Sequence, residues 1–158
     1  MVSLAHLEHD DRALRVELHG ADEAFANMLR RSLSDVAVPA VTSATVRKNT
    51  SAFASDILAH RLGLVPLRST FAEHAPATLA ARGPCVVRAG AIRAEHVEVA
   101  APHVLVVALN EGEELDATLH VELGTGKQHA RHSAAVAARA VRRHEGMQLR
   151  ADGTRAAL

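Results

Sequence analysis

The run at residues 115–123 constrains the fold of this chain more than any other segment. Apolar side chains alternate there with polar ones in the order Leu-Asp-Ala-Thr-Leu-His-Val-Glu-Leu. Successive side chains of a β-strand point to opposite faces of a sheet, so this run predicts a strand with one buried and one solvated face. The chain must therefore build a sheet whose apolar face is covered by another layer.

Further short strands are expected on both sides of this run. Residues 14–18 alternate in the same way, and they predict a second half-buried strand. Four short segments have the length and β-branched content of strands, at residues 41–46, 85–87, 97–99 and 104–109. By contrast, residues 69–84 are rich in Ala, Thr, Pro and Gly, and we expect a loop or lobe boundary there. Residues 134–158 fit a strand or a helix followed by a frayed tail, and periodicity does not decide between them.

Two helices are also expected, so the predicted fold class is α+β. Asp22 can cap the first helix, because its carboxylate can accept from the free N–H groups of the first turn. Pro39 ends this helix, and Ser55 can cap a second one that runs to about Leu62, with Gly63 as its stop. The first helix carries one apolar stripe at helical spacing, made of Phe25, Met28, Leu29, Leu33 and Val36.

Composition excludes several classes of protein. The chain has 18 basic and 18 acidic residues, without the basic excess that is usual when a protein grips nucleic acid by itself. Its three phenylalanines are the only aromatic residues, so the core must consist of Leu, Val, Ile and Ala. Cys85, the single cysteine, excludes an intrachain disulfide and is expected to be a small core residue. Without a signal peptide or an apolar run of membrane-spanning length, we expect a soluble intracellular protein.

Two ordered groups of motifs go beyond periodicity. The first group is F-A-N-M-L-R-R at 25–31, Val38-Pro39, and A-H-R-L-G-L-V-P-L at 59–67. The second group is G-P-C-V at 83–86, L-N-E-G at 109–112 and G-T-G-K-Q-H-A at 124–130. In order and spacing they resemble the alpha-like subunits of multisubunit DNA-directed RNA polymerases. These are the N-terminal domain of bacterial alpha, its archaeal counterpart and the third-largest subunit of nuclear RNA polymerase II.

The resemblance implies a fold and a domain division. The family fold is α+β, with an alpha-like dimerization lobe that carries an inserted β-rich lobe. In this chain residues 1–68 and about 134–158 correspond to the dimerization lobe, and residues 69–133 correspond to the inserted lobe. Residues 138–143 could supply the strand that returns to the first lobe. We expect the family's closing C-terminal helix to be missing or much shortened, and its bacterial promoter-binding domain and cysteine-containing lobe to be absent. We therefore expect a reduced member, which would suit a virus with its own polymerase or a divergent cellular lineage.

The resemblance also implies a function. Family members are non-catalytic assembly subunits that pair with a smaller alpha-like subunit and then dock the second-largest and largest polymerase subunits, reaching DNA only indirectly. No catalytic residue, metal or cofactor is expected in this chain. The residues expected to bind partners are Phe25, Asn27, Met28, Leu29, Arg30, Arg31, Leu33, His60, Arg61, Leu62, Gly63, Leu64 and Pro66.

Other interpretations of these features stay open. The apolar helix stripe could be intramolecular core, and Arg30 and Arg31 could be a solvated face. A degenerate relative could regulate or sequester polymerase subunits as a binding module. His129 and His132 could belong to a small metal hydrolase, although no third ligand is apparent nearby. The glycines before Lys127 lack the full phosphate-loop pattern, and a β-turn is expected there.

Overall fold

The computed structural model describes residues 1–10, 13–69, 74–143 and 146–152. These residues form two compact units, which are treated separately here. The terminal unit comprises Met1–Ala37 and the described residues from Thr125 onward, and the central unit comprises the described part of Val38–Gly124. The units are defined by packing, so the family-based lobe boundaries near residues 68 and 134 stay predictions.

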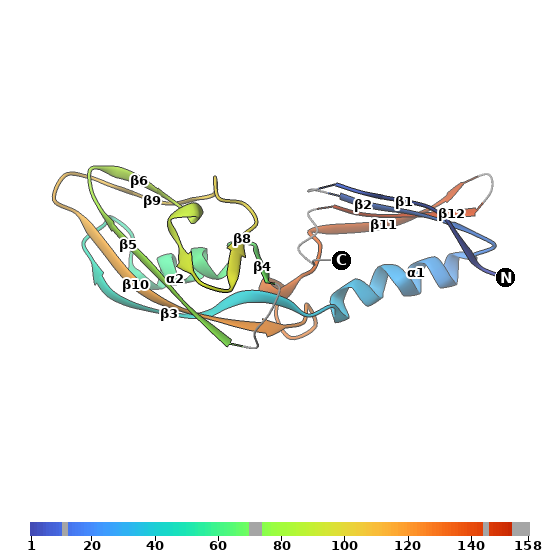
Figure 1. The fold of residues 1–158 in the computed structure, drawn as a ribbon, viewed down its shortest axis with the longest axis horizontal. Coiled ribbons are helices and arrows are strands. Elements are labelled where there is room, and N and C mark those ends of the chain that lie inside the picture. The colour runs from blue at the N-terminus through green and yellow to red at the C-terminus, as the bar shows by residue number, and fades with distance from the viewer. Residues whose placement is uncertain (11–12, 70–73, 144–145, 153–158) are drawn as a thin grey trace. The chain divides into compact units, whose positions relative to one another are not determined.

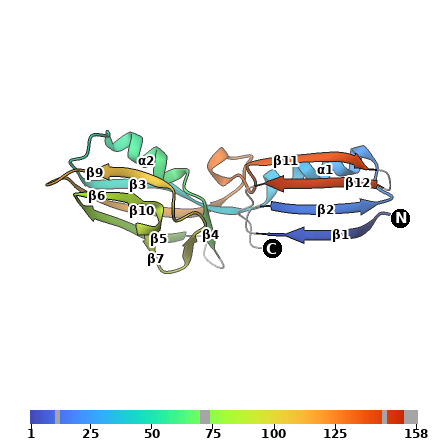
Figure 2. The same cartoon turned by 90° about the horizontal axis from the view of Figure 1, so that it is seen from above.

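A four-stranded antiparallel sheet forms the terminal unit, with a helix along one face (Figure 1). Figure 2 shows the strands side by side in the order β1 (Ser3–His9), β2 (Ala13–His19), β12 (Gly146–Asp152) and β11 (Ala137–Arg143). The helix α1 (Glu23–Ser32) continues into the 3-10 helix η1 (Leu33–Asp35) and packs against β11 and β12. The unit also contains a single-turn 3-10 helix, η3 (Ala130–His132).

The structure confirms the first predicted helix and its cap, but the helical turns end at Asp35 and not at Pro39, which lies within the strand Val38–Asn49. The Asp22 carboxylate accepts a hydrogen bond from the Phe25 backbone N–H at 2.7 Å. The apolar stripe is buried only in part, because Met28 is 54% exposed while Leu29 is half-buried. The fully buried residue of α1 is Ala26, whose small side chain lets the helix lie close to the sheet.

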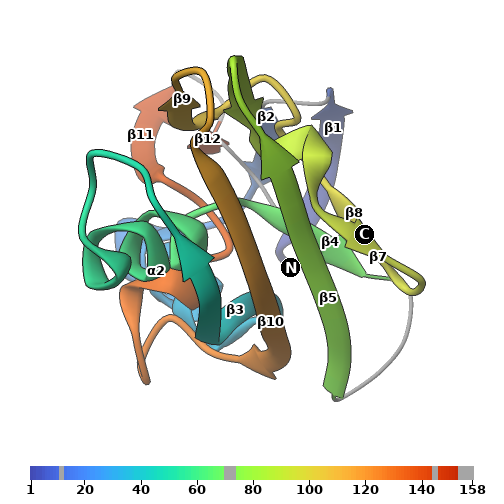
Figure 3. The same cartoon turned by 90° about the vertical axis from the view of Figure 1, so that its left-hand side faces the viewer.

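The central unit contains the predicted amphipathic strand at its middle. Its main sheet has the order β3 (Val38–Asn49), β10 (Glu114–Gly124), β5 (His74–Arg82) and β7 (Arg93–Ala94). Figure 3 shows β3, β10 and β5 side by side, with the helix α2 (Ser55–Gly63) next to β3. Two small two-stranded sheets complete the unit, β4 (Leu67–Ser69) with β8 (Val97–Val99), and β6 (Cys85–Arg88) with β9 (Leu105–Leu109). The single-turn η2 (Ala89–Ala91) follows β6.

The alternation of β10 is confirmed almost throughout. Leu115, Ala117, Leu119 and Val121 are at most 3% exposed and lie in the core, whereas Leu123 at the strand end is exposed. The largest fully buried side chains in the described part of the chain are all leucines and valines, as the scarcity of aromatic residues requires.

The prediction of a loop at residues 69–84 is wrong for most of this segment. β5 occupies residues 74–82 and pairs with β10 along its whole length. Ala75, Ala77 and Leu79 face the core, while Pro76 and Thr78 are exposed. Alanine contrasts weakly with its polar neighbours and has a low strand propensity, so this alternation gives little signal in the sequence. Residues 70–73 of the expected loop lie outside the described part.

The strands at the two ends of the chain go beyond the prediction. The returning strand expected at 138–143 is confirmed as β11, and β12 follows it as the second strand of an antiparallel pair. In β12 the buried Met147, Leu149 and Ala151 alternate with half-buried polar residues. The strand β1 was not expected at all. The predicted tail at 153–158 lies outside the described residues.

Two local predictions are wrong. Cys85 is exposed rather than buried: it begins β6 on the same side of the strand as Val87, but only Val87 reaches the core. Ser55 does not cap α2. The N-cap is Ala54, which makes no side-chain hydrogen bond, and the Ser55 hydroxyl accepts from Asn49 Nδ2 at 3.2 Å instead.

Candidate partner-binding surfaces

The helix α1 presents one face to its own sheet and another to solvent. Of the predicted partner-binding residues, Phe25, Leu29 and Leu33 are half-buried on the sheet side. Asn27 and Met28 are exposed on the other side. A partner could therefore reach the polar and apolar side chains of the outer face without displacing any part of the sheet.

The two arginines of α1 differ in their surroundings. The Nε of Arg30 donates to Asn27 Oδ1 at 3.0 Å, which holds the side chain against the helix surface. The Arg31 guanidinium is exposed and has no hydrogen-bond or ion-pair partner among the described residues. Arg31 thus offers a planar set of donors to a carboxylate or carbonyl of another molecule.

The apolar face of the terminal sheet extends beyond the area that α1 covers. Leu4 and Leu7 of β1 lie opposite Leu18 and Val16 of β2, on the face that bears the buried Leu18. They are nevertheless 60% and 52% exposed, because α1 packs mainly on β11 and β12. An exposed apolar edge of this kind is typical of a surface that another element covers.

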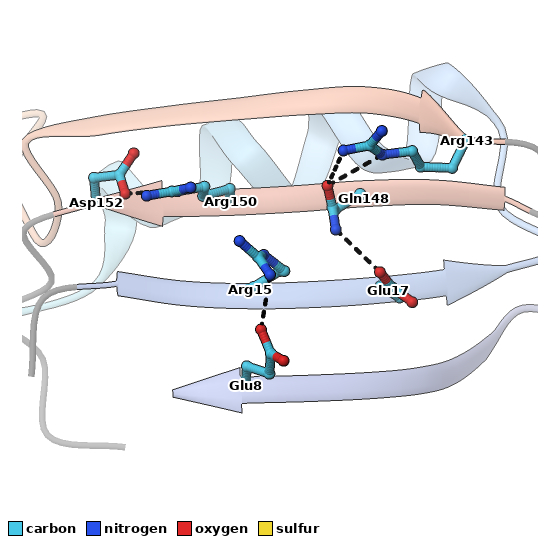
Figure 4. Close-up of polar contacts among 7 residues, drawn as sticks. All are labelled: Glu8, Arg15, Glu17, Arg143, Gln148, Arg150 and Asp152. Atoms are coloured by element: carbon cyan, nitrogen blue, oxygen red, sulfur yellow. Dashed lines mark hydrogen bonds and ion pairs between the residues drawn. The ribbon is translucent and has the colours of Figure 1, made fainter. Parts of the chain in front are cut away.

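The opposite face of the terminal sheet is polar, and its side chains form hydrogen bonds and ion pairs with one another (Figure 4). Arg15 pairs with Glu8 across β1 and β2 at 2.9 Å, and Gln148 Nε2 donates to Glu17 Oε1 at 3.0 Å. Arg143 Nη2 in turn donates to Gln148 Oε1 at 3.0 Å. Internal partners occupy these side chains, so this face is a weaker candidate for partner binding than the outer face of α1.

The second predicted motif lies at the end of α2 in the central unit. Leu62 and Gly63 are buried in the core of that unit, so they support the surface rather than form it. His60 and Leu64 are exposed, whereas Pro66 is half-buried. The structure therefore brings only part of the motif to the surface.

Arg61 anchors an apolar surface of which the sequence prediction included only Leu64. Its Nη2 donates to the Leu105 carbonyl oxygen at 3.3 Å, and its guanidinium carbon lies 5.3 Å from the centre of the Phe53 ring. Ile57 lies one turn before Arg61 and is 49% exposed, and Phe53, Leu64 and Leu105 are also exposed. We call Phe53, Ile57, Leu64 and Leu105 the α2 surface. Its signal in the sequence is that Ile57 and Leu64 fall outside the core positions 58 and 62, at helical spacing from each other.

The proposed histidine site does not assemble. His129 Nδ1 accepts from the backbone N–H and the Nε of Arg131, at 3.1 Å and 3.2 Å. His132 is buried and has interactions of its own. Within residues 1–10, 13–69, 74–143 and 146–152, no group of three or more His, Cys, Asp or Glu side chains could hold a metal ion. In the same ranges, neither α-helix has the length and hydropathy needed to cross a membrane.

Comparison with known proteins agrees with the motif series. A family profile described as the RNA polymerase Rpb3/RpoA insert domain matches residues 68–141. A protein named DNA-directed RNA polymerase subunit Rpo3 from Thermococcus kodakarensis is 32% identical over 145 residues, which cover 83% of this chain and 56% of that protein. The chain belongs to the family of alpha-like RNA polymerase subunits. The Rpo3 subunit of Natronomonas pharaonis is 33% identical over 139 residues, covering 83% of this chain and 56% of the relative.

A third relative extends the comparison to another organism. The Rpo3 subunit of Methanocaldococcus jannaschii is 33% identical over 112 residues, which cover 68% of this chain and 59% of the relative. The chain thus spans somewhat more than half the length of the alpha-like subunits it matches.

Proposed function

We propose that this chain is a non-catalytic assembly subunit of a DNA-directed RNA polymerase. The observation that carries the proposal is the similarity to proteins named Rpo3 across 83% of the chain. In this role the chain pairs with a smaller alpha-like subunit and then docks the second-largest and largest subunits. Nucleotidyl transfer and direct contact with DNA are assigned to those other chains, on the basis of the family resemblance.

The outer face of α1 supports the pairing step. The exposed Met28 provides an apolar contact at the centre of this face. The exposed Asn27 provides a polar group next to it, as does Arg31, whose guanidinium has no partner among the described residues. Helix pairing needs this combination, because burial of apolar area supplies affinity and the charged groups select the partner. Leu4 and Leu7 on β1 add apolar area that a partner could cover in the same unit.

The α2 surface supports the docking of a large subunit. Its four exposed apolar side chains come from α2, its two flanking segments and β9, and Arg61 holds two of these segments together through Leu105 and Phe53. This surface belongs to the central unit, whereas α1 belongs to the terminal unit. Separate surfaces would let the chain hold two partners at once, as an assembly subunit must.

Affinity purification of the full tagged chain from cells that express it tests the proposal. The purified material should contain the two large polymerase subunits and one small alpha-like partner. Ile57→Asp should reduce recovery of the large subunits and leave the small partner bound, because the change lies on the α2 surface alone. Recovery of the chain by itself from transcribing cells would refute the proposal.

A further inference from the structure

The end of α1 and the connector after β10 form a groove in the terminal unit. The Lys127 ammonium pairs with Asp35 Oδ1 at 2.5 Å, and the Lys127 backbone N–H donates to the Ser34 carbonyl oxygen at 3.3 Å. These contacts bring the G-T-G-K segment beside the F-A-N-M-L-R-R helix, although the two are far apart in sequence. The groove has a volume of about 630 Å³, and its lining includes Asn27, Met28, Arg30, Arg31, Asp35 and Lys127.

The groove gathers positively charged side chains, although the formal net charge of the chain is zero. The sequence has 18 basic and 18 acidic residues, yet the described lining has three cations, Arg30, Arg31 and Lys127, against the single carboxylate of Asp35. Asp35 is already engaged by Lys127. Arg30 uses only its Nε internally, and Arg31 uses no guanidinium donor within the described residues. The groove therefore keeps two sets of strong donors without an acceptor in this part of the chain.

Stabilisation of the helix explains only part of this arrangement. Basic side chains in the last turn of a helix interact favourably with the negative end of the helix dipole, which accounts for Arg30 and Arg31. It does not account for Lys127, which comes from a distant segment and is fixed in place by Asp35 and Ser34. Nor does it account for the exposed Met28 on the same lining.

We propose that this groove binds an acidic segment of a partner protein. The Arg30 and Arg31 guanidinium groups hold a partner carboxylate through paired N–H donors, and Met28 packs against an apolar side chain beside it. Lys127 adds a second positive contact at the other wall. The apolar Met28 between the charges favours a peptide over a nucleic acid backbone, which would need a broad basic surface. The inference rests on the proposed function in one respect, that the acidic segment comes from a polymerase chain.

Zero-length cross-linking can locate this contact directly. Lys48 and Lys127 are the two lysines of the chain, so a carbodiimide amide between lysine and a touching carboxylate is easy to assign. In the complex purified with the full tagged chain, Lys127 should link to an Asp or Glu of another subunit as well as to Asp35. Lys48, which pairs with Glu114 in the central unit, serves as an internal control for intramolecular links. A complex that contains polymerase subunits but shows Lys127 linked only to Asp35 would overturn the inference and leave the proposed function standing.

Two charge variants test the groove independently, because they should change partner recovery in opposite directions. The double change Arg30→Glu, Arg31→Glu should lower partner recovery at low salt about tenfold, because like charges then face each other. Asp35→Asn should raise recovery, since it removes the carboxylate that lines the groove. Arg139→Glu on β11, also exposed and without a partner among the described residues, is the matched control and should change nothing.

The variants also separate the two proposals. Equal recovery of wild-type and Asp35→Asn protein, together with unchanged recovery of the double variant, would contradict the inference. If the double variant does not fold, as judged by its thermal unfolding, the Asp35→Asn result and the wild-type cross-link still test whether the groove binds an acidic partner segment. Absence of all polymerase subunits from the wild-type preparation would overturn the proposed function and this inference with it.

Discussion

Replacing Met28 with aspartate separates pairing from folding on α1. Burying a whole methionine side chain stabilises by about 1.5–3 kcal/mol. Since Met28 is 54% exposed in the free chain, covering the rest would contribute roughly half of that, about 0.8–1.6 kcal/mol. An aspartate would lose this term and add the cost of an unpaired polar group in the interface, about 1–3 kcal/mol. The total is about 1.8–4.6 kcal/mol, which corresponds to roughly 20- to 2,000-fold weaker pairing.

The same change should leave the chain folded. Met28 lies on the solvent face of α1, so the variant loses a few tenths of a kcal/mol in helix propensity and about 0.7–1.4 kcal/mol for the part of the side chain that is already buried. The free energy of unfolding should therefore fall by less than about 2 kcal/mol. Titration calorimetry against the purified small partner measures the pairing affinity, and urea unfolding measures the free energy of unfolding. Val141→Asp, at an exposed apolar position on β11, is the matched control. A folded Met28→Asp protein that pairs with normal affinity would refute the assignment of this helix face to partner binding.

Three further predictions concern the fold. Leu119→Ala should lower the free energy of unfolding by about 2–5 kcal/mol in urea, because the side chain is fully buried in the central core, and a loss below about 1 kcal/mol would contradict that burial. Asp22→Ala should cost about 0.5–2 kcal/mol through loss of the helix cap, whereas Asp22→Ser should retain most of the stability. The hydrogen bond from Lys48, its charge and that of Arg82 hold the pKa of Glu114 below its ordinary value. The resulting stability is therefore present above the ordinary carboxyl pKa and is lost as the pH falls through the folded-state pKa. An NMR titration should show the Glu114 pKa rising in Lys48→Met, and an unchanged pKa would count against the ion pair.

Much of the fold could be predicted because local patterns and tertiary burial agree. In β10 each apolar side chain from Leu115 to Val121 faces the core, so the period of two alone identifies the strand. At α1 the cap is a short-range interaction between Asp22 and Phe25, which the sequence places at the right spacing. The glycine of the Leu-Asn-Glu-Gly motif also has a local reason, since Gly112 adopts a positive φ of 80°, which glycine favours.

The missed strands have specific physical causes. In β1 an irregularity between Leu4 and His6 puts Leu4 and Leu7 on one face although they are three residues apart, so the period of two is broken in the sequence. In β5 the core positions are mostly alanine, which hydrophobic patterning does not distinguish from a loop. Both strands exist because another strand pairs with them, β2 with β1 and β10 with β5, and such pairing does not show in a strand's own pattern of residues.

The candidate site was predicted unevenly for related reasons. The motifs fall on the helices α1 and α2, but Leu62 and Gly63 turned out to be core, since a string of residue types cannot show which of its side chains point outward. The α2 surface depends on Leu105, which reaches Arg61 from another strand. The groove depends on contact between Lys127 and Asp35, and no spacing rule connects those two positions.

Subunit stoichiometry in purified, actively transcribing polymerase tests the central claim most directly. Native mass spectrometry of the complex isolated through its second-largest subunit would count the copies of this chain. An assembly subunit should be present at one copy per second-largest subunit, together with one small alpha-like partner. A substoichiometric amount, with full transcription activity in complexes that lack the chain, would show that it regulates or sequesters polymerase subunits instead.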